Sequence, residues 1–242
     1  MTDAHTVRPP GHPSGDSDAR QRLIDAARRL FSRHGFEGIS TRAVATDAGV
    51  DAALIRYYFG NKAGLFEQML LETLAPVRER LRDSRHPQLN SHLPDHDHCQ
   101  VTERLAALMR SYYQAMAPNP ELPRLIQRVL HGDPGSESYQ IVHRLFEGML
   151  AQSHQWIQNM LVQAGHLPSD LDPRLVRLSF LSLMAFPLVA PPMVVQASGL
   201  ALDTEHMERL VQHNVTILQR ALQLPAASPA AFQVKESLDA HS

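Results

Sequence analysis

The feature that most constrains the fold is a run of helical signals between residues 20 and 66, broken at short intervals by glycine or by a helix-capping side chain. From Leu23 to Phe31, apolar residues recur at three- and four-residue spacing, the period of one face of an α-helix. Gly35 follows where such a helix is expected to end. This punctuation favours several short helices that share one small core.

Three more helices are expected in the same region. Ser40 stands at a predicted N-cap, and Gly49 is expected to end the helix that Ser40 begins. Asp51 is expected to cap the next helix, and Asn61 a fourth, with a kink at Pro76. Two short helices around a glycine turn are typical of a helix-turn-helix, whose second helix enters the DNA major groove. Many small helical bundles contain the same arrangement, so the spacing alone leaves both interpretations open.

Charge is distributed unevenly along the chain. Residues 20–62 hold eight basic and four acidic side chains, a balance of +4, so the remainder must carry −6 to give the overall −2. A basic head on an acidic body is compatible with phosphate binding at one end, because neutralised phosphates release counterions.

The order of residues in this region carries a specific resemblance. The matching positions are Ala26, Ala27, Leu30, Phe31, Gly35, Phe36, Ser40, Thr41, Ala45, Ala48, Gly49, Val50, Ile55, Tyr57, Tyr58, Phe59, Lys62, Gly64, Leu65 and Phe66. Together they resemble the N-terminal domain of the tetracycline repressor (TetR) family. Leu54 and Arg56 depart from that pattern, where a hydroxyl residue and a tyrosine are common, so an operator sequence cannot be transferred from other members.

The resemblance implies a set of DNA-contacting residues. Arg42 matches a position that contacts bases or backbone, and residues 52–54 open the recognition helix. The tyrosines and the lysine match phosphate-contacting positions, although Tyr58 has an alternative role as a core residue packed on Phe31. The complete predicted set is Thr41, Arg42, Ala52, Ala53, Leu54, Arg56, Tyr57, Tyr58 and Lys62.

Beyond Pro76 the pattern stays helical and shows no strand-length alternation, so the predicted fold class is all-α: a three-helix DNA-binding domain followed by a helical bundle. The expected divisions are a flexible tail at 1–18, the head at 19–66, the body at 67–224 and a second flexible tail at 225–242. The resemblance implies that the body binds a small effector and forms a homodimer through its last two long helices. The run from Leu178 to Met184 and a stripe on the final helix suit that interface: Met207, Leu210, Val211, Asn214, Ile217, Leu218 and Leu222.

Aromatic and methionine residues of the body form a candidate effector pocket suited to a largely apolar ligand. The same residues would also serve in an ordinary core, and the polar members lie on a short helix that could equally face water. The predicted pocket residues are Tyr112, Tyr113, Met116, Arg128, His131, Phe146, Trp156, Met160, Phe180 and Met184.

The histidine-rich segment 86–99 leaves an alternative open. Imidazole and thiolate groups bind zinc or copper, but the prolines in this segment favour a solvated loop, and no metal or cofactor is assigned. The chain lacks a glycine-rich phosphate loop, a Gly-Xaa-Ser-Xaa-Gly motif and a His-Glu-Xaa-Xaa-His pair, so an enzyme is not expected.

Residues 178–195 carry no charge, yet three prolines and two serines favour a buried or subunit-facing helix over a membrane span. With one cysteine and no leader, the cytoplasm is the expected location.

The predicted function is a homodimeric transcriptional regulator, a repressor, that binds a palindromic double-stranded DNA operator and is released by a small-molecule effector. The alternatives are a metal-responsive regulator using loop 86–99 and a helical small-molecule-binding protein that does not bind DNA.

Overall fold

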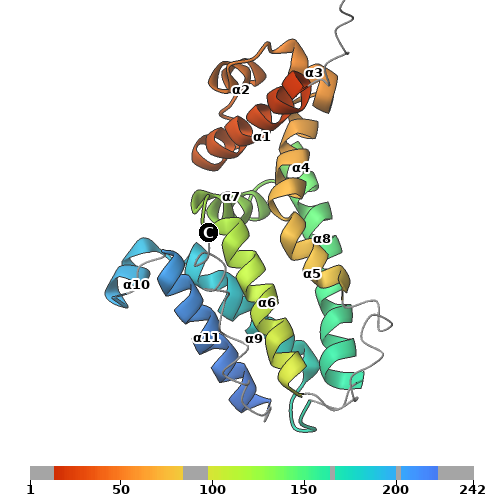
Figure 1. The fold of residues 1–242 in the computed structure, drawn as a ribbon, viewed down its shortest axis with the longest axis vertical. Helices are drawn as coiled ribbons and strands as arrows, with labels where there is room; N and C mark the ends of the chain where they lie inside the picture. The colour runs from red at the N-terminus through yellow and green to blue at the C-terminus, as the bar shows by residue number, and fades with distance from the viewer. Residues whose placement is uncertain (1–13, 84–97, 164–166, 200–202, 223–242) are drawn as a thin grey trace, which may run out of the picture. The chain divides into compact units, whose positions relative to one another are not determined.

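The computed structural model describes residues 14–83, 98–163, 167–199 and 203–222, and within these ranges it contains helices and no strands (Figure 1). The predicted all-α class is therefore confirmed. Contacts divide the chain into two compact units, the first ending at Met69 and the second beginning at Leu70. The finer domain limits given above stay predictions.

The first unit is built from short helices whose starts are set by side-chain caps. The Oγ of Ser40 accepts a hydrogen bond from the backbone N–H of Ala43 at 3.2 Å, and the Oδ1 of Asn61 accepts one from Gly64 at 2.8 Å. Both predicted caps are confirmed, since each satisfies a helix N–H that has no intrahelical partner. The helices are α1 (Ser14–His34), α2 (Thr41–Ala48), α3 (Ala53–Phe59) and the first part of α4 (Lys62–Thr73).

The start of α1 differs from the expectation of a flexible tail through residue 18, because the helix already begins at Ser14. Two contacts support these early turns. Asp18 pairs with Arg22 one turn later at 3.1 Å, and Ala19 is buried. The segment has few apolar residues, so its sequence did not indicate a helix. The burial of Ala19 and the ion pair between Asp18 and Arg22 stabilise it.

Three phenylalanine rings form the centre of the first unit. The ring of Phe31 on α1 lies 5.3 Å from that of Phe66 on α4, and Phe36, in the α1–α2 connection, contacts both at centroid distances of 5.8 and 5.0 Å. Edge and tilted aromatic contacts of this kind add to the hydrophobic stabilisation of burial. They hold α1 and α4 together behind the helix-turn-helix.

The second unit is a helical bundle. Helix α6 packs against α5 and α11, and α9 packs against α7, α8 and α11 (Figure 1). The predicted stripe across residues 139–161 is one α-helix only to Ile157 and continues as a π-helical stretch. The elements are α5 (Ala75–Asp83), α6 (His98–Met116), α7 (Glu121–Leu130), α8 (Glu137–Ile157), the π-helix η2 (Gln158–Gln163), α9 (Pro173–Val189), α10 (Pro192–Ala197) and α11 (Thr204–Ala221).

Helix α9 runs through Pro187, which lies inside the helix. Proline has no N–H, so the carbonyl of Leu183 one turn earlier loses its intrahelical donor. Side chains from two neighbouring helices replace it: the Nδ2 of Asn214 on α11 donates at 3.0 Å, and the hydroxyl of Tyr113 on α6 donates at 3.3 Å. The proline is tolerated because its neighbours satisfy the freed carbonyl.

The apolar stripe of α11 faces the interior of its own unit. Most of its members are buried there, which corrects their assignment to a subunit interface, while Ile217 remains 42% exposed. A bidentate ion pair from Arg110 on α6 to Glu208, with N–O distances of 2.8–3.0 Å, holds the same helix from the side. The buried stripe residues are Met207, Val211, Asn214, Leu218 and Leu222.

Across the described ranges, no helix combines the length and apolar character that a bilayer crossing requires.

Candidate nucleic-acid interface and internal cavity

The helix-turn-helix is fastened to α1 by two arginines. The guanidinium of Arg22 donates to the carbonyl of Ala48 at 3.3 Å, at the end of α2. Arg29 donates to the carboxylate of Asp47 at 2.6 Å. Gly49 follows with φ of 64°, a left-handed conformation that glycine adopts without steric cost. The turn between α2 and α3 is thus fixed at its start by backbone geometry and by contacts from α1.

Helix α3 has one buried side and one exposed side. Ile55 is 2% exposed and anchors the helix, whereas Arg56 is exposed and Tyr57 is 73% exposed. Arg42 on α2 is also exposed. Of the other predicted contact residues, Ala53 is exposed, and Thr41, Ala52 and Leu54 are half-buried. The structure therefore leaves two cations and an aromatic ring of this unit in contact with solvent.

Tyr58 occupies an intermediate environment. Its ring lies 4.9 Å from that of Tyr57 and 5.9 Å from that of Phe59, and its side chain is half-buried. The rings that pack on Phe31 are those of Phe36 and Phe66. Tyr58 thus contacts the aromatic rings on either side of it in the sequence of α3, those of Tyr57 and Phe59.

Lys62 begins α4 in a defined position. Its ammonium lies 4.3 Å from the centre of the Phe36 ring, a cation–π contact that restrains the side chain. The first turn of α4 comes very close to the end of α3, because a Cβ on Gly64 would collide with the carbonyl oxygen of Phe59. A glycine at this position allows Lys62 and the N-terminus of α4 to follow α3 directly.

The second unit contains a partly open cavity of about 220 Å³. Its wall comes from Leu74, which lies between α4 and α5, and from helices α5, α6, α8 and α9. The lining residues are Leu74, Val77, Leu81, Leu108, Tyr112, Phe146, Met149, Leu150, Ser153, Phe180, Leu181, Met184 and Ala185.

The structure brings four of the predicted pocket residues to this cavity: Tyr112, Phe146, Phe180 and Met184. The others lie elsewhere. Trp156 is buried behind the wall, with its ring 6.1 Å from that of Phe180. Tyr113 and Met116 are buried, Arg128 and His131 are exposed, and the side chain of Met160 lies outside the described residues.

Sequence reasoning missed the wall contributed by Leu74, Val77 and Leu81. Their spacing is helical, so a signal existed, but the same spacing marks any buried helix face.

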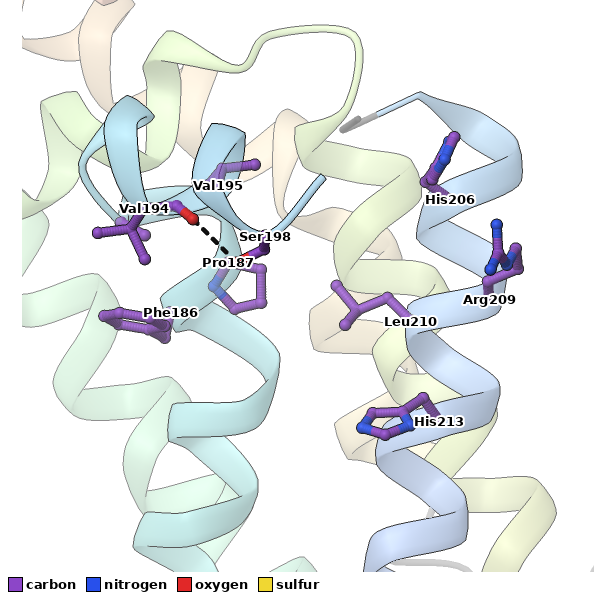
Figure 2. Close-up of a pocket in the computed structure, with 10 residues that line it drawn as sticks. Phe186, Pro187, Val194, Val195, Ser198, His206, Arg209, Leu210 and His213 are labelled. Carbon is purple, nitrogen blue, oxygen red and sulfur yellow. Dashed lines mark hydrogen bonds between the residues drawn. The ribbon is translucent and has the colours of Figure 1, made fainter. Parts of the chain in front are cut away.

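A second, open groove of about 400 Å³ lies between the end of α9, α10 and α11. Figure 2 shows Phe186, Pro187 and Val194 on one side and the α11 residues, including Arg209 and His213, on the other. The hydroxyl of Ser198 donates to the carbonyl of Val194 at 2.9 Å and closes the end of α10. Sequence reasoning did not predict α10.

The exposed face of α9 continues the apolar side of this groove. Leu175, Leu178 and Phe186 lie on this face, and each is more than half exposed, with Leu178 at 60%. Exposed apolar patches are a common feature of protein–protein interaction surfaces.

Most of the histidine-rich segment 86–99 lies outside the described residues, and in the ranges that are described, acidic, histidine and cysteine side chains form no group of three suited to a metal ion.

Comparison with protein families gives a match over residues 23–69 to the model described as bacterial regulatory proteins, tetR family. The regulatory protein RaaS of Mycobacterium tuberculosis, an HTH-type transcriptional regulator, is 30% identical over 172 residues, covering 70% of this chain and 69% of its own length. The regulator BetI of Agrobacterium fabrum is 44% identical over 66 residues, which span 27% of this chain and 29% of that protein.

Solved structures share the fold. The transcriptional regulator FadR of Bacillus subtilis, crystallised in complex with stearoyl-CoA, aligns with a TM-score of 0.60 and 18% identity over 83% of this chain and 98% of its own. GusR of Salmonella enterica aligns with a TM-score of 0.58 and 15% identity over 89% of this chain and 100% of its own.

Proposed function

The chain belongs to the TetR family of bacterial transcriptional regulators, and on that basis we propose that it is a homodimeric repressor that binds a near-palindromic operator and is released by a small apolar effector. The observation that carries the DNA part is the solvent-facing set Arg42, Arg56 and Tyr57 on a helix-turn-helix that α1 holds rigid. A preorganised surface loses less conformational entropy on binding than a flexible one.

In this proposal, α3 lies in the major groove. Arg56 and Arg42 reach base edges or phosphates, since a guanidinium can form two parallel hydrogen bonds with guanine or with a phosphate. Tyr57 and Lys62 contact phosphates and set the register of the helix, and the half-buried Tyr58 assists them. Thr41 supports the start of α2, while Ala52, Ala53 and Leu54 present small and apolar groups to the bases. Two such heads bind half-sites about one helical turn apart, ~34–36 Å.

The partner in the dimer is a second copy of this chain, and the proposed contact is the exposed apolar face of α9, namely Leu175, Leu178 and Phe186. Ile217 of α11 is a further exposed apolar residue of the same unit. Two copies of one face can pair around a twofold axis, as most homodimers do. A palindromic operator requires that symmetry.

The effector site is the 220 Å³ cavity, whose wall includes Phe180 and Met184 on the opposite side of α9. The Bacillus subtilis regulator FadR, which shares this fold, was crystallised in complex with stearoyl-CoA, a ligand with a long apolar chain, and this supports an apolar ligand here. Because α9 borders both the cavity and the proposed interface, a ligand that prefers one packing of α9 shifts the dimer between arrangements. The shift is limited by the ligand's difference in affinity for the two arrangements.

The test is a salt titration of operator binding by the full chain, using duplexes from its own upstream region. Lys62→Ala should weaken binding to all sequences and reduce the slope of log K against log salt by about one phosphate contact. Arg56→Ala should cost about 1–3 kcal/mol and relax preference at one base pair. Arg82→Ala, an exposed cation of the second unit, is the matched control and should change neither quantity. Equal binding of operator and scrambled duplexes would refute DNA recognition.

A further inference from the structure

The wall of the 220 Å³ cavity is formed almost entirely by apolar and aromatic side chains. None of the described residues that line it is acidic, basic, a histidine or an amide. The only hydroxyl groups in the wall belong to Tyr112 and Ser153. A charged ligand group would therefore lose its hydration without meeting a counter-charge, which disfavours its entry.

The two hydroxyl groups differ in availability. The Oγ of Ser153 donates to the carbonyl of Leu150 on its own helix at 2.9 Å, so its proton is already used. Tyr113, next to Tyr112 on α6, donates its hydroxyl to the carbonyl of Leu183. Within the described part of the chain, the hydroxyl of Tyr112 makes no hydrogen bond.

A tyrosine hydroxyl without a protein partner remains able to donate to a ligand. Burial raises the pKa of Tyr112 to about 12, so its hydroxyl stays protonated and remains a donor throughout the physiological pH range. Among the described residues that line the cavity, Tyr112 therefore has the one side-chain hydroxyl without a protein partner, and no lining side chain carries a charge.

We propose that the ligand of this cavity is an uncharged, mainly apolar molecule with a single hydrogen-bond acceptor, such as a ketone or ester oxygen, which accepts from the hydroxyl of Tyr112. The proposal rests on the cavity being the effector site described above. Its volume of 220 Å³ is about 1.5 times that of a ~150 Å³ apolar cavity that accommodates benzene, so a substituted aromatic or short acyl compound has the right size. Carboxylates of the same size should bind more weakly, because no described lining residue supplies a counter-charge.

The test uses three probes of similar size and the purified full-length protein. Propiophenone carries one acceptor, butylbenzene carries none, and 3-phenylpropanoate carries a negative charge. Binding is followed by calorimetry and by the fluorescence of Trp156, the only tryptophan of the chain, whose ring contacts the wall residue Phe180. Propiophenone should bind about five- to tenfold more tightly than butylbenzene, the range of one hydrogen bond, and 3-phenylpropanoate should bind most weakly.

Tyr112→Phe removes the donor and keeps the ring. It should erase the preference for propiophenone over butylbenzene while leaving butylbenzene affinity unchanged. Tyr113→Phe is the matched control, because its hydroxyl is used by Leu183, and the preference should persist in that variant. A preference that survives Tyr112→Phe, an equal affinity for 3-phenylpropanoate, or no binding of any probe would overturn the proposal.

Operator binding in a gel-shift assay is measured separately with the same compounds. If propiophenone binds through Tyr112 but does not change operator affinity, the ligand class stands and the proposed effector function fails. If a carboxylate releases the operator while propiophenone does not bind, the regulatory function stands and the ligand class is wrong.

Discussion

The carbonyl of Leu183 gives a quantitative test of how the second unit accommodates Pro187. Asn214 is 3% exposed and donates to this carbonyl at 3.0 Å, so Asn214→Ala removes a buried donor. A hydrogen bond of this kind contributes about 1 kcal/mol, and the space left by the amide adds about as much again. We expect Asn214→Ala to lower the free energy of unfolding by about 2 kcal/mol. The remaining donor, Tyr113 at 3.3 Å, limits the loss.

Pro187→Ala gives the carbonyl of Leu183 an additional hydrogen-bond donor. Alanine supplies the N–H that proline lacks, and in a regular helix this group donates to Leu183. In the Pro187→Ala background the carbonyl no longer depends on Asn214. The cost of Asn214→Ala should then fall to about 1 kcal/mol, which leaves a coupling of about 1 kcal/mol in a double-mutant cycle.

The four proteins of the cycle are unfolded in urea at one protomer concentration, because the stability of a dimer depends on concentration. Trp156 fluorescence reports on the second unit, which contains all the substituted positions. Thr216→Ala is the control on α11, since its hydroxyl bonds only to Gln212 of its own helix and should cost the same in both backgrounds. A coupling below about 0.3–0.5 kcal/mol, the usual error of additivity, would refute the replacement of the missing N–H by Asn214.

Two further predictions concern α9 and α11. Leu178 is 60% exposed, and Leu178→Arg should convert the dimer to monomers in analytical ultracentrifugation and weaken operator binding. The control Ala151→Arg, at an exposed position of α8, should leave the protein dimeric. A Leu178→Arg protein that remains dimeric would exclude this face of α9 as the interface. Asp203 caps α11. Its carboxyl group accepts a hydrogen bond from the backbone N–H of His206, and this bond is the main reason why the pKa of Asp203 is lowered; the contact with the His206 side chain lowers it further. A lowered pKa means that the stabilisation is present above the ordinary aspartate pKa of about 3.9 and is lost as the pH falls through the folded value. Thermal melts between pH 5 and pH 2 should therefore show a smaller fall in Tm for Asp203→Asn, and parallel curves would contradict the cap.

The first unit was largely predictable because its signals are local. Ser40 and Asn61 each bond to an N–H three residues away, and Gly49 ends α2 through its own φ angle. Such features depend on a few consecutive residues and need no knowledge of distant contacts. The exposure of Arg42 and Arg56 follows once the buried side of each short helix is known.

The cavity was only partly predictable, because its wall depends on contacts between distant segments. Arg128 and His131 were assigned to it from their polarity, yet the buried side of α7 is formed by Leu122, Leu125 and Ile126, which leaves both polar residues exposed. Leu81 was missed because nothing in its neighbourhood distinguishes a cavity wall from a filled core. Periodicity identifies which face of a helix is buried, but it does not reveal which buried atoms leave space between them.

Helix α9 explains why the apolar run from Leu178 to Val195 resisted assignment. The sequence alternatives were a membrane span and a buried or subunit-facing helix. In the structure, Phe180 and Met184 face the interior of the protomer while Leu178 and Phe186 are exposed. A helix that is apolar all round requires apolar partners on all sides. Its own protomer covers only the inner side, and in the proposed dimer a second copy of the chain covers the outer side. These two packing demands on a single helix explain why charge is absent from residue 178 to the end of α9, whose charged residues, Arg174 and Arg177, lie in its first two turns.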